Sequence, residues 1–160
     1  MVPYFKPINL NRNFGICQQM RAISYQASYG SLDGFERDYG DSYRVRLQQK
    51  IDNLPQGCCH LWLGDKVVGQ TEAKWIADST VGYINLLVVS PDYQRQGFGS
   101  LMVDYLADVF IAAGKTSMQL SVSPTNRQAL AFYAANGWQD AGQRPNSSMR
   151  LYTRSLSKRR

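Results

Sequence analysis

The chain has 160 residues, of which 44% are hydrophobic and 19% charged, and its formal net charge is +6. This length favours one domain over 1–160, and the composition is that of a globular protein rather than a disordered one. No apolar run is long enough to span a membrane, and the start lacks the long apolar stretch of a secretory signal. We therefore expect a cytoplasmic protein without a membrane partner.

The three cysteines are Cys17, Cys58 and Cys59, and His60 follows the last of them. Neighbouring residues of a strand point to opposite faces, so Cys58 and Cys59 cannot easily share a metal or a bridge. A zinc site needs spaced ligand pairs, which this sequence lacks. We expect buried thiols in a reducing compartment and no metal site.

Part of the basic excess lies near the C-terminus, in Arg150, Arg154, Lys158, Arg159 and Arg160. A basic surface attracts nucleic acid, acidic proteins or phosphorylated cofactors alike, and a solvated chain end explains such a run without any partner. No nucleic-acid reader motif accompanies these charges. The sequence therefore does not favour a nucleic-acid partner, and it leaves a homodimer open.

The first third of the chain is polar, and its periodicity predicts helices over 16–28 and 41–54 with a loop at 29–34 between them. We expect residues 1–57 to form a helical segment. Five aromatic residues gather there, and they either form a pocket wall or belong to the core: Tyr25, Tyr29, Phe35, Tyr39 and Tyr43.

The middle of the chain changes to strand character. Short apolar or alternating runs at 58–63, 67–75 and 81–89 are separated by tight turns, and this pattern predicts an antiparallel meander. Pro91 ends the third of these strands.

The last third returns to helical periodicity between further strands. The pattern predicts a helix over 99–113 that ends at Gly114, a strand over 117–122, a helix over 126–135, and closing strands from 138 onward and over 149–153. A strand, a helix and a second strand in this order imply a crossover, so strands 81–89 and 117–122 should be parallel. The fold class is therefore α+β with a mixed sheet.

A strand, a glycine-containing turn and a helix succeed one another between Ile84 and Ala113. The start of a helix leaves backbone N–H groups unpaired, its dipole favours negative charge, and glycines let the backbone approach an anion closely. Arg95 adds a positive charge, and no acidic residue occurs from Gln94 to Val103. The turn therefore suits a phosphate, although a plain strand-to-helix connection would also explain it. It matches neither the P-loop nor the dinucleotide fingerprint.

The string Gln94-Arg95-Gln96-Gly97-Phe98-Gly99 resembles the Gln/Arg-x-x-Gly-x-Gly/Ala signature of the GNAT superfamily of N-acetyltransferases. The string from Asn126 to Trp138, Asn-Arg-Gln-Ala-Leu-Ala-Phe-Tyr-Ala-Ala-Asn-Gly-Trp, is similar to the second half of the family pattern. The resemblance implies a mostly antiparallel sheet of six to seven strands, about four flanking helices and a splayed parallel strand pair. It further implies that the helical segment 1–57 lies on the side of the amine acceptor, with a cofactor-binding core at 58–142 and a closing strand with a basic tail at 143–160.

The resemblance also implies acetyl-CoA as co-substrate and no metal. The pantetheine arm would pair with the backbone of the splayed strand, and the pyrophosphate would bind the turn. The residues so implied are Leu87, Val88, Val89, Gln94, Arg95, Gln96, Gly97, Phe98, Gly99, Ser100 and Asn126. Asn126 has a second reading, as a helix cap.

The implied reaction is direct attack of a neutral amine on the thioester, which needs no enzyme nucleophile. The N–H of Val88 would stabilise the developing oxyanion. Tyr133 matches the family's general acid, which protonates the departing thiolate, and its other reading is a core tyrosine. The sequence thus predicts an acetyl-CoA-dependent N-acetyltransferase.

The general base is less clearly indicated. In the family's bacterial ribosomal-protein alanine acetyltransferases a Glu stands where this chain has Ser121. We take Glu72 as the substitute base, acting through water, with a solvated strand residue as the alternative. Tyr83 and Asn85 are expected to line the acceptor channel. Because the peptide-type base is missing, the sequence favours a small-molecule amine over a peptide amine, and a silent coenzyme A-binding module is the further alternative.

Overall fold

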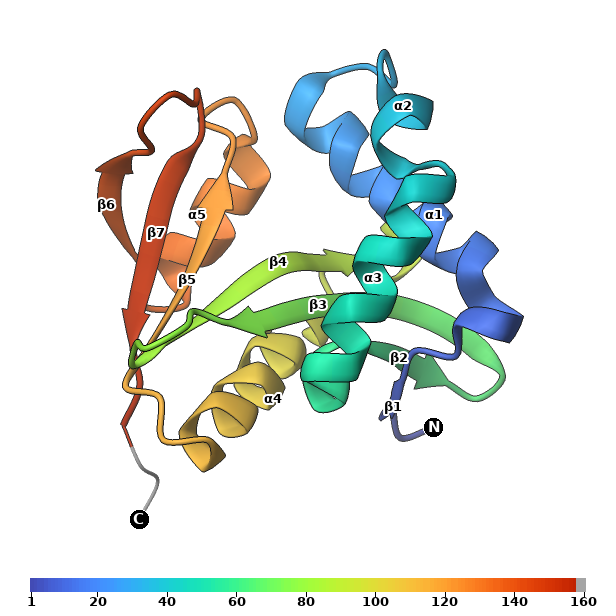
Figure 1. Cartoon of the computed structure of the whole chain (residues 1–160), viewed down its shortest axis with the longest axis horizontal. Coiled ribbons are helices and arrows are strands. Elements are labelled where there is room, and N and C mark those ends of the chain that lie inside the picture. The colour runs from blue at the N-terminus through green and yellow to red at the C-terminus, as the bar shows by residue number, and fades with distance from the viewer. Residues whose placement is uncertain (158–160) are drawn as a thin grey trace.

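The computed structural model describes residues 1–157, which form a seven-stranded mixed sheet with helices on both faces (Figure 1). The strands, in chain order, are β1 (Tyr4–Pro7), β2 (Cys59–Leu63), β3 (Lys66–Trp75), β4 (Val81–Val89), β5 (Ser117–Val122), β6 (Gln139–Gln143) and β7 (Arg150–Ser155). The α-helices are α1 (Leu10–Tyr29), α2 (Phe35–Tyr39), α3 (Asp41–Asn53), α4 (Phe98–Ala112) and α5 (Arg127–Ala135). The predicted α+β class is confirmed.

The sheet order is β1-β2-β3-β4-β5-β7-β6, and β2, β3 and β4 form the predicted antiparallel meander. Strand β1 was not predicted, and it pairs with β2 at the edge of the sheet. Its last residue is Pro7. A proline has no backbone N–H to donate, and an edge strand tolerates it because one side of that strand has no neighbour to bond. The edge position explains why this short segment lacks a clear strand pattern.

Strands β4 and β5 are parallel, but they pair only from Val81 with Ser117 to Ile84 with Leu120. Beyond Ile84, β4 continues along β3 while β5 continues along β7. Figure 1 shows the two strands diverging in this region. The predicted splayed pair is therefore confirmed, and the splay leaves one edge of β4 without a strand neighbour.

Helix α1 begins at Leu10, earlier than predicted, because Asn9 caps it by accepting a hydrogen bond from the Arg12 N–H at 3.2 Å. Such a cap satisfies one of the N–H groups that have no partner inside the helix. The helix ends at Gly30, whose φ of 75° is the left-handed conformation that favours glycine. The second half of α1 lies beside the splayed end of β4, where Met20 packs against Leu86 and Val88.

The two faces of the sheet are covered by different helices. Met20 of α1 packs on one face against Leu86 and Val88, whereas Met102 of α4 packs on the other face against Val68. Helices α4 and α5 share the main hydrophobic core with β5 on that second face. The opening of the sheet therefore lies between α1 on one side and α5 on the other.

The three cysteines are buried free thiols within residues 1–157. In this part of the chain no group of three or more potential ligands is placed to hold a metal ion. None of its helices combines the length and hydrophobicity that a membrane span requires. Lys158, Arg159 and Arg160 of the predicted basic tail lie outside the described residues. The cytoplasmic location, the lack of a nucleic-acid partner and the homodimer stay predictions.

Candidate active site

The turn between β4 and α4 presents unpaired backbone donors. Arg95 has a φ of 63° and Gly97 a φ of 87°, and the successive backbone N–H groups of such a turn can form a concave nest for an anion. Gly97 occupies the cap position of α4 and offers no side-chain cap. The first N–H groups of α4 have no partner inside the helix, so they are available to an anion.

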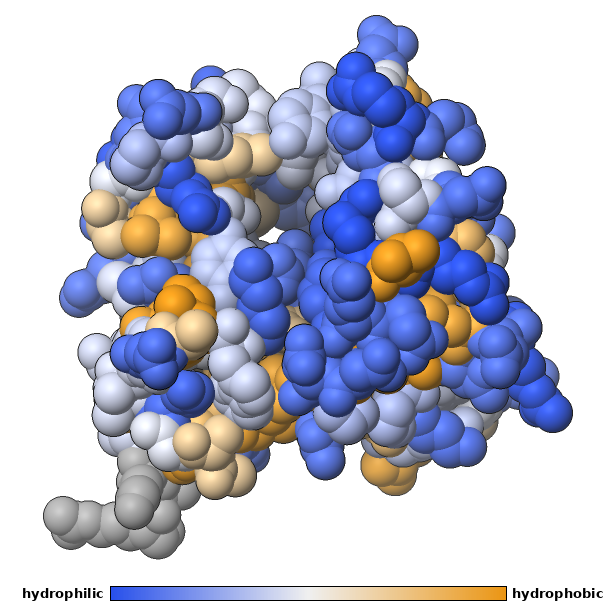
Figure 2. Space-filling model, in the orientation of Figure 1, coloured by the Kyte–Doolittle hydropathy of each residue, from blue (hydrophilic) through white to orange (hydrophobic). Residues whose placement is uncertain are grey.

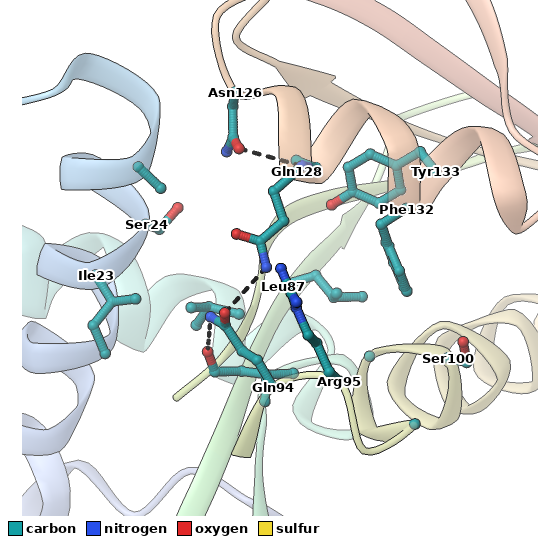
Figure 3. Close-up of a pocket in the computed structure, with 16 residues that line it drawn as sticks. Ile23, Ser24, Leu87, Gln94, Arg95, Ser100, Asn126, Gln128, Phe132 and Tyr133 are labelled. Atoms are coloured by element: carbon teal, nitrogen blue, oxygen red, sulfur yellow. Dashed lines mark hydrogen bonds between the residues drawn. The ribbon is translucent and has the colours of Figure 1, made fainter. Parts of the chain in front are cut away.

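A cavity of about 540 Å³ opens directly above this turn, between β4, α1 and α5 (Figure 3). Its lining residues are Ile23, Ser24, Ala27, Leu87, Val88, Val89, Gln94, Arg95, Gly97, Gly99, Ser100, Asn126, Gln128, Ala129, Phe132 and Tyr133. Every site residue that the sequence predicts is in this lining except Gln96, Phe98 and Glu72. Two motifs that are far apart in the sequence therefore form opposite walls of one cavity.

The register of β4 shows which of its backbone groups face the open edge. The Ser90 N–H donates to the Val68 carbonyl at 2.8 Å, and in an antiparallel pair alternate residues bond the same neighbour. Val88 therefore faces β3, while Leu87 and Val89 face the splay. Consistently, the Val89 carbonyl accepts a hydrogen bond from Gln94 Nε2 on that side at 2.9 Å. The register contradicts the orientation predicted for the Val88 N–H, which points to β3, whereas the Leu87 N–H points to the open edge.

Tyr133 lies on α5, and its hydroxyl points into the cavity (Figure 3). The ring is 8% exposed and packs against Trp138, with ring centroids 5.5 Å apart. Burial raises the pKa of Tyr133, because it disfavours the charged phenolate. The phenol therefore keeps its proton at neutral pH, as a proton donor must.

Asn126 lies where it can serve both predicted roles, as the cap of α5 and as a residue of the cavity wall. Its Oδ1 accepts the Ala129 N–H at 3.2 Å and so caps α5, and the residue also lines the cavity. The capping reading is confirmed. Because Oδ1 is used by the cap, Nδ2 is the group of this side chain that suits a cofactor acceptor atom.

Glu72 does not reach the cavity, and the reading of it as a solvated strand residue is wrong. Its carboxylate is fully buried and accepts hydrogen bonds from Arg21 at 2.6 and 3.1 Å and from Lys50 at 2.8 Å. Tyr43 and Gln70 also donate to it. Burial would raise the pKa of Glu72, but the charges of Arg21 and Lys50 outweigh burial and lower the pKa to about 2. A carboxylate so occupied is a poor proton acceptor, and Glu72 is not among the described residues that line the two cavities.

A second cavity, of about 180 Å³, lies beside the first on the α1 face of the sheet, and Ser24 lines both. Figure 2 shows the surface hollowed between the α1–α2 region and the β6–β7 hairpin. The lining comprises Arg21, Ser24, Tyr25, Ser28, Tyr29, Tyr39, Tyr83, Ile84, Asn85, Ser121 and Met149. The structure thus brings the predicted channel residues Tyr83 and Asn85 together with Ser121.

The aromatic residues of the first third divide between this cavity and the interior. Tyr25, Tyr29 and Tyr39 line the second cavity, whereas Phe35 and Tyr43 are buried. The two readings left open by the sequence therefore each apply to part of the set. No Asp or Glu lines either cavity within the described residues.

Arg144 is a neighbour of this cavity that the sequence did not indicate. It follows β6, and its Nη1 donates to the Tyr83 hydroxyl at 2.8 Å and to Ser121 Oγ at 2.7 Å. The two hydroxyls are themselves 2.6 Å apart. Arg144 lies 61 positions from Tyr83 in the chain and belongs to neither motif, so only the folded structure could reveal this contact.

A splayed parallel pair that opens onto an unpaired helix start defines a class of α+β proteins, and this chain has both features. The chain belongs to the acetyltransferase (GNAT) family, whose model matches residues 24–138. The resemblance seen in the two motifs is therefore confirmed over most of the chain.

Individual relatives agree with this assignment at differing coverage. The [ribosomal protein bS18]-alanine N-acetyltransferase of Escherichia coli is 37% identical over 60 residues, which are 38% of this chain and only 40% of that protein. The peptidyl-lysine N-acetyltransferase YjaB of Salmonella typhimurium is 28% identical over 70% of this chain and 72% of its own length. The crystal structure of the PaiA N-acetyltransferase of Thermoplasma acidophilum, in complex with coenzyme A, shares the fold with a TM-score of 0.81 at 13% identity. It covers 98% of this chain and 100% of that one.

Proposed function

We propose that this protein transfers the acetyl group of acetyl-CoA to the primary amine of a small molecule by direct attack. The observation that carries this proposal is a single cavity that joins the free N–H groups of the α4 start, the open edge of β4 and the Tyr133 hydroxyl. Pyrophosphate, pantetheine and thioester would meet these three features in that order.

The residues present fit the cofactor. The nest around Arg95 and Gly97 supplies donors for the pyrophosphate, and Arg95 adds a positive charge. Leu87 and Val89 offer an N–H and a C=O to an extended amide-containing arm, as a neighbouring strand would. Gln94 bonds the Val89 carbonyl in the structure, so its side chain would move aside or share that carbonyl with the arm.

Acetyl-CoA supplies an activated acyl group, and the chemistry left to the protein is orientation and proton transfer. The Leu87 N–H would stabilise the negative charge that develops on the carbonyl oxygen as the amine nitrogen bonds the carbonyl carbon. As the C–S bond breaks, the Tyr133 hydroxyl would donate its proton to the thiolate. The nitrogen, positively charged once it has bonded the carbonyl carbon, would release a proton to solvent and the phenol would regain one from solvent, so that one proton passes in net from the amine to the thiol.

The amine would reach the site already neutral. Among residues 1–157, no Asp or Glu lines either cavity, and Glu72 is held by Arg21 and Lys50. The ammonium would then lose its proton to water before attack. Below the pKa of the amine, we expect kcat/KM to rise about tenfold per pH unit, because the fraction of neutral amine rises by the same factor. A plateau that begins far below that pKa would reveal a protein base.

The second cavity supports a small acceptor. Its volume of about 180 Å³ suits a compact molecule, and Ser121 stands where the family's peptide-type Glu would be. A peptide or protein amine is the alternative, and the matches to the bS18-alanine and peptidyl-lysine acetyltransferases favour it. Turnover of peptide amines in preference to every small amine would decide for this alternative.

The proposal is tested by calorimetry with coenzyme A and by thiol release from acetyl-CoA with a panel of small amines and peptides. Tyr133→Phe should bind coenzyme A normally but lower kcat about 100-fold, which is within the usual range for a general acid. Tyr152→Phe is the matched control, because its ring lies 6.3 Å from that of Tyr133 without lining the cavity. Binding without any turnover would indicate a silent module, and no binding at millimolar coenzyme A would refute the cofactor site.

A further inference from the structure

The wall of the second cavity is polar and lacks negative charge. Hydroxyl groups of Ser24, Tyr83 and Ser121 and the amide of Asn85 line it, together with the guanidinium-bearing Arg21. No Asp or Glu joins them among the described residues. A site for a simple ammonium ion would be expected to offer an anion, so this lining points to a different recognition chemistry.

The charge of Arg21 is already balanced. Its guanidinium forms two hydrogen bonds with the buried Glu72 carboxylate, at 2.6 and 3.1 Å, and is therefore part of the scaffold. Burial lowers the pKa of Arg21 but the Glu72 charge raises it further, so the guanidinium stays charged. Arg21 thus shapes the floor of the cavity and has little capacity left for a ligand.

The charge of Arg144 is not balanced in this way. None of the ion pairs found within residues 1–157 includes Arg144. One of its nitrogens, Nη1, donates to both Tyr83 and Ser121, which line the cavity. A guanidinium carries five N–H donors in a planar fork, so Nη2 and Nε keep donors for a second partner. Two hydroxyls and a fork thus converge beside one cavity.

The amide of Asn85, in the wall of the same cavity, has an unused hydrogen-bond acceptor. Asn85 is the extra residue of a β-bulge, because Leu86 pairs with Glu72 while Ile84 already pairs with Ala73. Its Oδ1 is buried and has no hydrogen-bond partner within the described residues. An unsatisfied buried acceptor is costly, and a half-turn of the amide would present either its acceptor or its donors to a ligand.

From these features we infer that the acceptor is an amine that also carries a carboxylate, and that Arg144, Tyr83 and Ser121 bind the carboxylate. Asn85 would then hold the amine, close to the carbonyl that the Leu87 N–H polarises. Tyr83 and Asn85 are two positions apart on the strand, roughly 7 Å, which suits a compact amino acid. This inference rests on the proposed function, because it names the substrate class of the same site.

The test compares amino acids with the amines that lack only the carboxyl group. For each pair, thiol release from acetyl-CoA is measured with the wild type, Arg144→Ala and Arg144→Lys. Wild type should prefer the amino acids, and Arg144→Ala should lower their kcat/KM about 10- to 100-fold, mainly through KM, as for a lost hydrogen bond to a charged group. Arg144→Lys should retain only part of the wild-type kcat/KM for amino acids, because lysine keeps the positive charge but lacks the planar fork of donors.

Two controls separate recognition from general charge and from folding. Arg12→Ala removes an exposed arginine near the start of α1, remote from the cavity, and should leave both kinds of amine unaffected. The decarboxylated amines should respond little to Arg144→Ala, so a variant that lowers turnover of both kinds equally would overturn the inference. Equal use of amino acids and decarboxylated amines by the wild type would overturn it as well.

Equilibrium binding keeps this inference distinct from the proposed function. Calorimetry with the same amino acids, in the absence and presence of coenzyme A, reports the carboxylate site without requiring turnover. Binding that weakens about 10- to 100-fold in Arg144→Ala would sustain the site even if no acetyl transfer occurred. The inference fails if the best amino acids bind the wild type and Arg144→Ala equally or bind neither, whatever the rate of transfer.

Discussion

The two cavities beside β4 are built in different ways. In the larger one, side chains of α1 and α5 form part of the wall, but the groups that suit the cofactor are mainly backbone groups, at the open edge of β4 and the start of α4. The smaller one is formed by side chains from α1, α2, β4 and β5, with Arg144 reaching it from the hairpin after β6. The first therefore depends on local conformation, and the second depends on how distant elements meet.

This difference separates what is shared with relatives from what is particular to the chain. A backbone site tolerates many side chains as long as the turn keeps its shape, so a short motif suffices to specify it. A side-chain site changes with each substitution in its wall. Variants that affect one cavity and leave the other intact would therefore sharpen the comparison, and variants that affect both would break it.

The largest effect is expected at Glu72, which supports only the acceptor side. Glu72→Gln leaves Arg21 and Lys50 buried without their partner and should lower the free energy of unfolding by about 3–5 kcal/mol. Urea unfolding measures this loss, and Asp140→Asn, which removes an exposed ion pair, is the control with little effect. At temperatures where the variant stays folded, coenzyme A should bind with unchanged affinity, and a matching loss of that affinity would show that the cavities are not independent.

Acid should weaken the same buried ion pairs of Glu72 with Arg21 and Lys50. The pKa of Glu72 is lowered from its ordinary 4.5 to about 2, so its stabilising contribution is full above 4.5 and is lost as the pH falls toward 2. The linkage amounts to about 3 kcal/mol. Urea unfolding in steps across this range should show a steeper decline in the wild type than in Glu72→Gln. Parallel declines would mean that other carboxylates dominate the acid sensitivity.

A smaller effect is expected at the phosphate turn. A side chain at Gly97, where φ is 87°, costs about 1–2 kcal/mol in this left-handed conformation, so Gly97→Ala should reshape the turn and weaken coenzyme A binding about tenfold. Gly114→Ala is the matched control, because φ there is 80° and the position also has open space, but it lies past the other end of α4. Equal affinities of the two variants for coenzyme A would remove the turn from the cofactor site.

The smallest effect is expected at Asn126. Asn126→Ala removes the cap of α5 and should cost about 1 kcal/mol in unfolding free energy. Asn126→Ser can still cap the helix but lacks the amide donor. If Asn126 also contacts the cofactor, the serine variant should keep its stability while binding coenzyme A more weakly. Wild-type affinity in the serine variant would leave Asn126 with the capping role alone.

The sequence predicted the strands of the meander and the crossover well, because their periodicity is strong and turns separate them. It missed β1, which is short and at an edge, and α2, which has only five residues. It also placed the start of α1 too late, because the cap at Asn9 was not recognised. These errors share a cause, since short or irregular elements are stabilised by tertiary contacts more than by their own pattern.

The cofactor cavity could be located from two motifs, whereas the acceptor cavity could be located only in part. An apolar-strand pattern cannot reveal that α1 and α3 bring Arg21 and Lys50 onto Glu72, so the sequence predicts either a base or a solvated strand residue at this position. Nor can it reveal the register, which turns the Val88 N–H toward β3 and the Leu87 N–H toward the open edge. Contacts between residues far apart in the chain decide both points.

The short pairing of β4 with β5 has a mechanical consequence. Among the described residues, these strands pair at only four positions, from Val81 to Ile84. The two halves of the sheet are therefore joined at one end of the strands and separate at the other. A molecule of coenzyme A between Leu87 and Tyr133 would contact both halves of the sheet and connect them at the open end. Loading the cofactor would then restrain the relative motion of the halves, and amide exchange at the free ends of β5 and α5 would slow before any amine arrived.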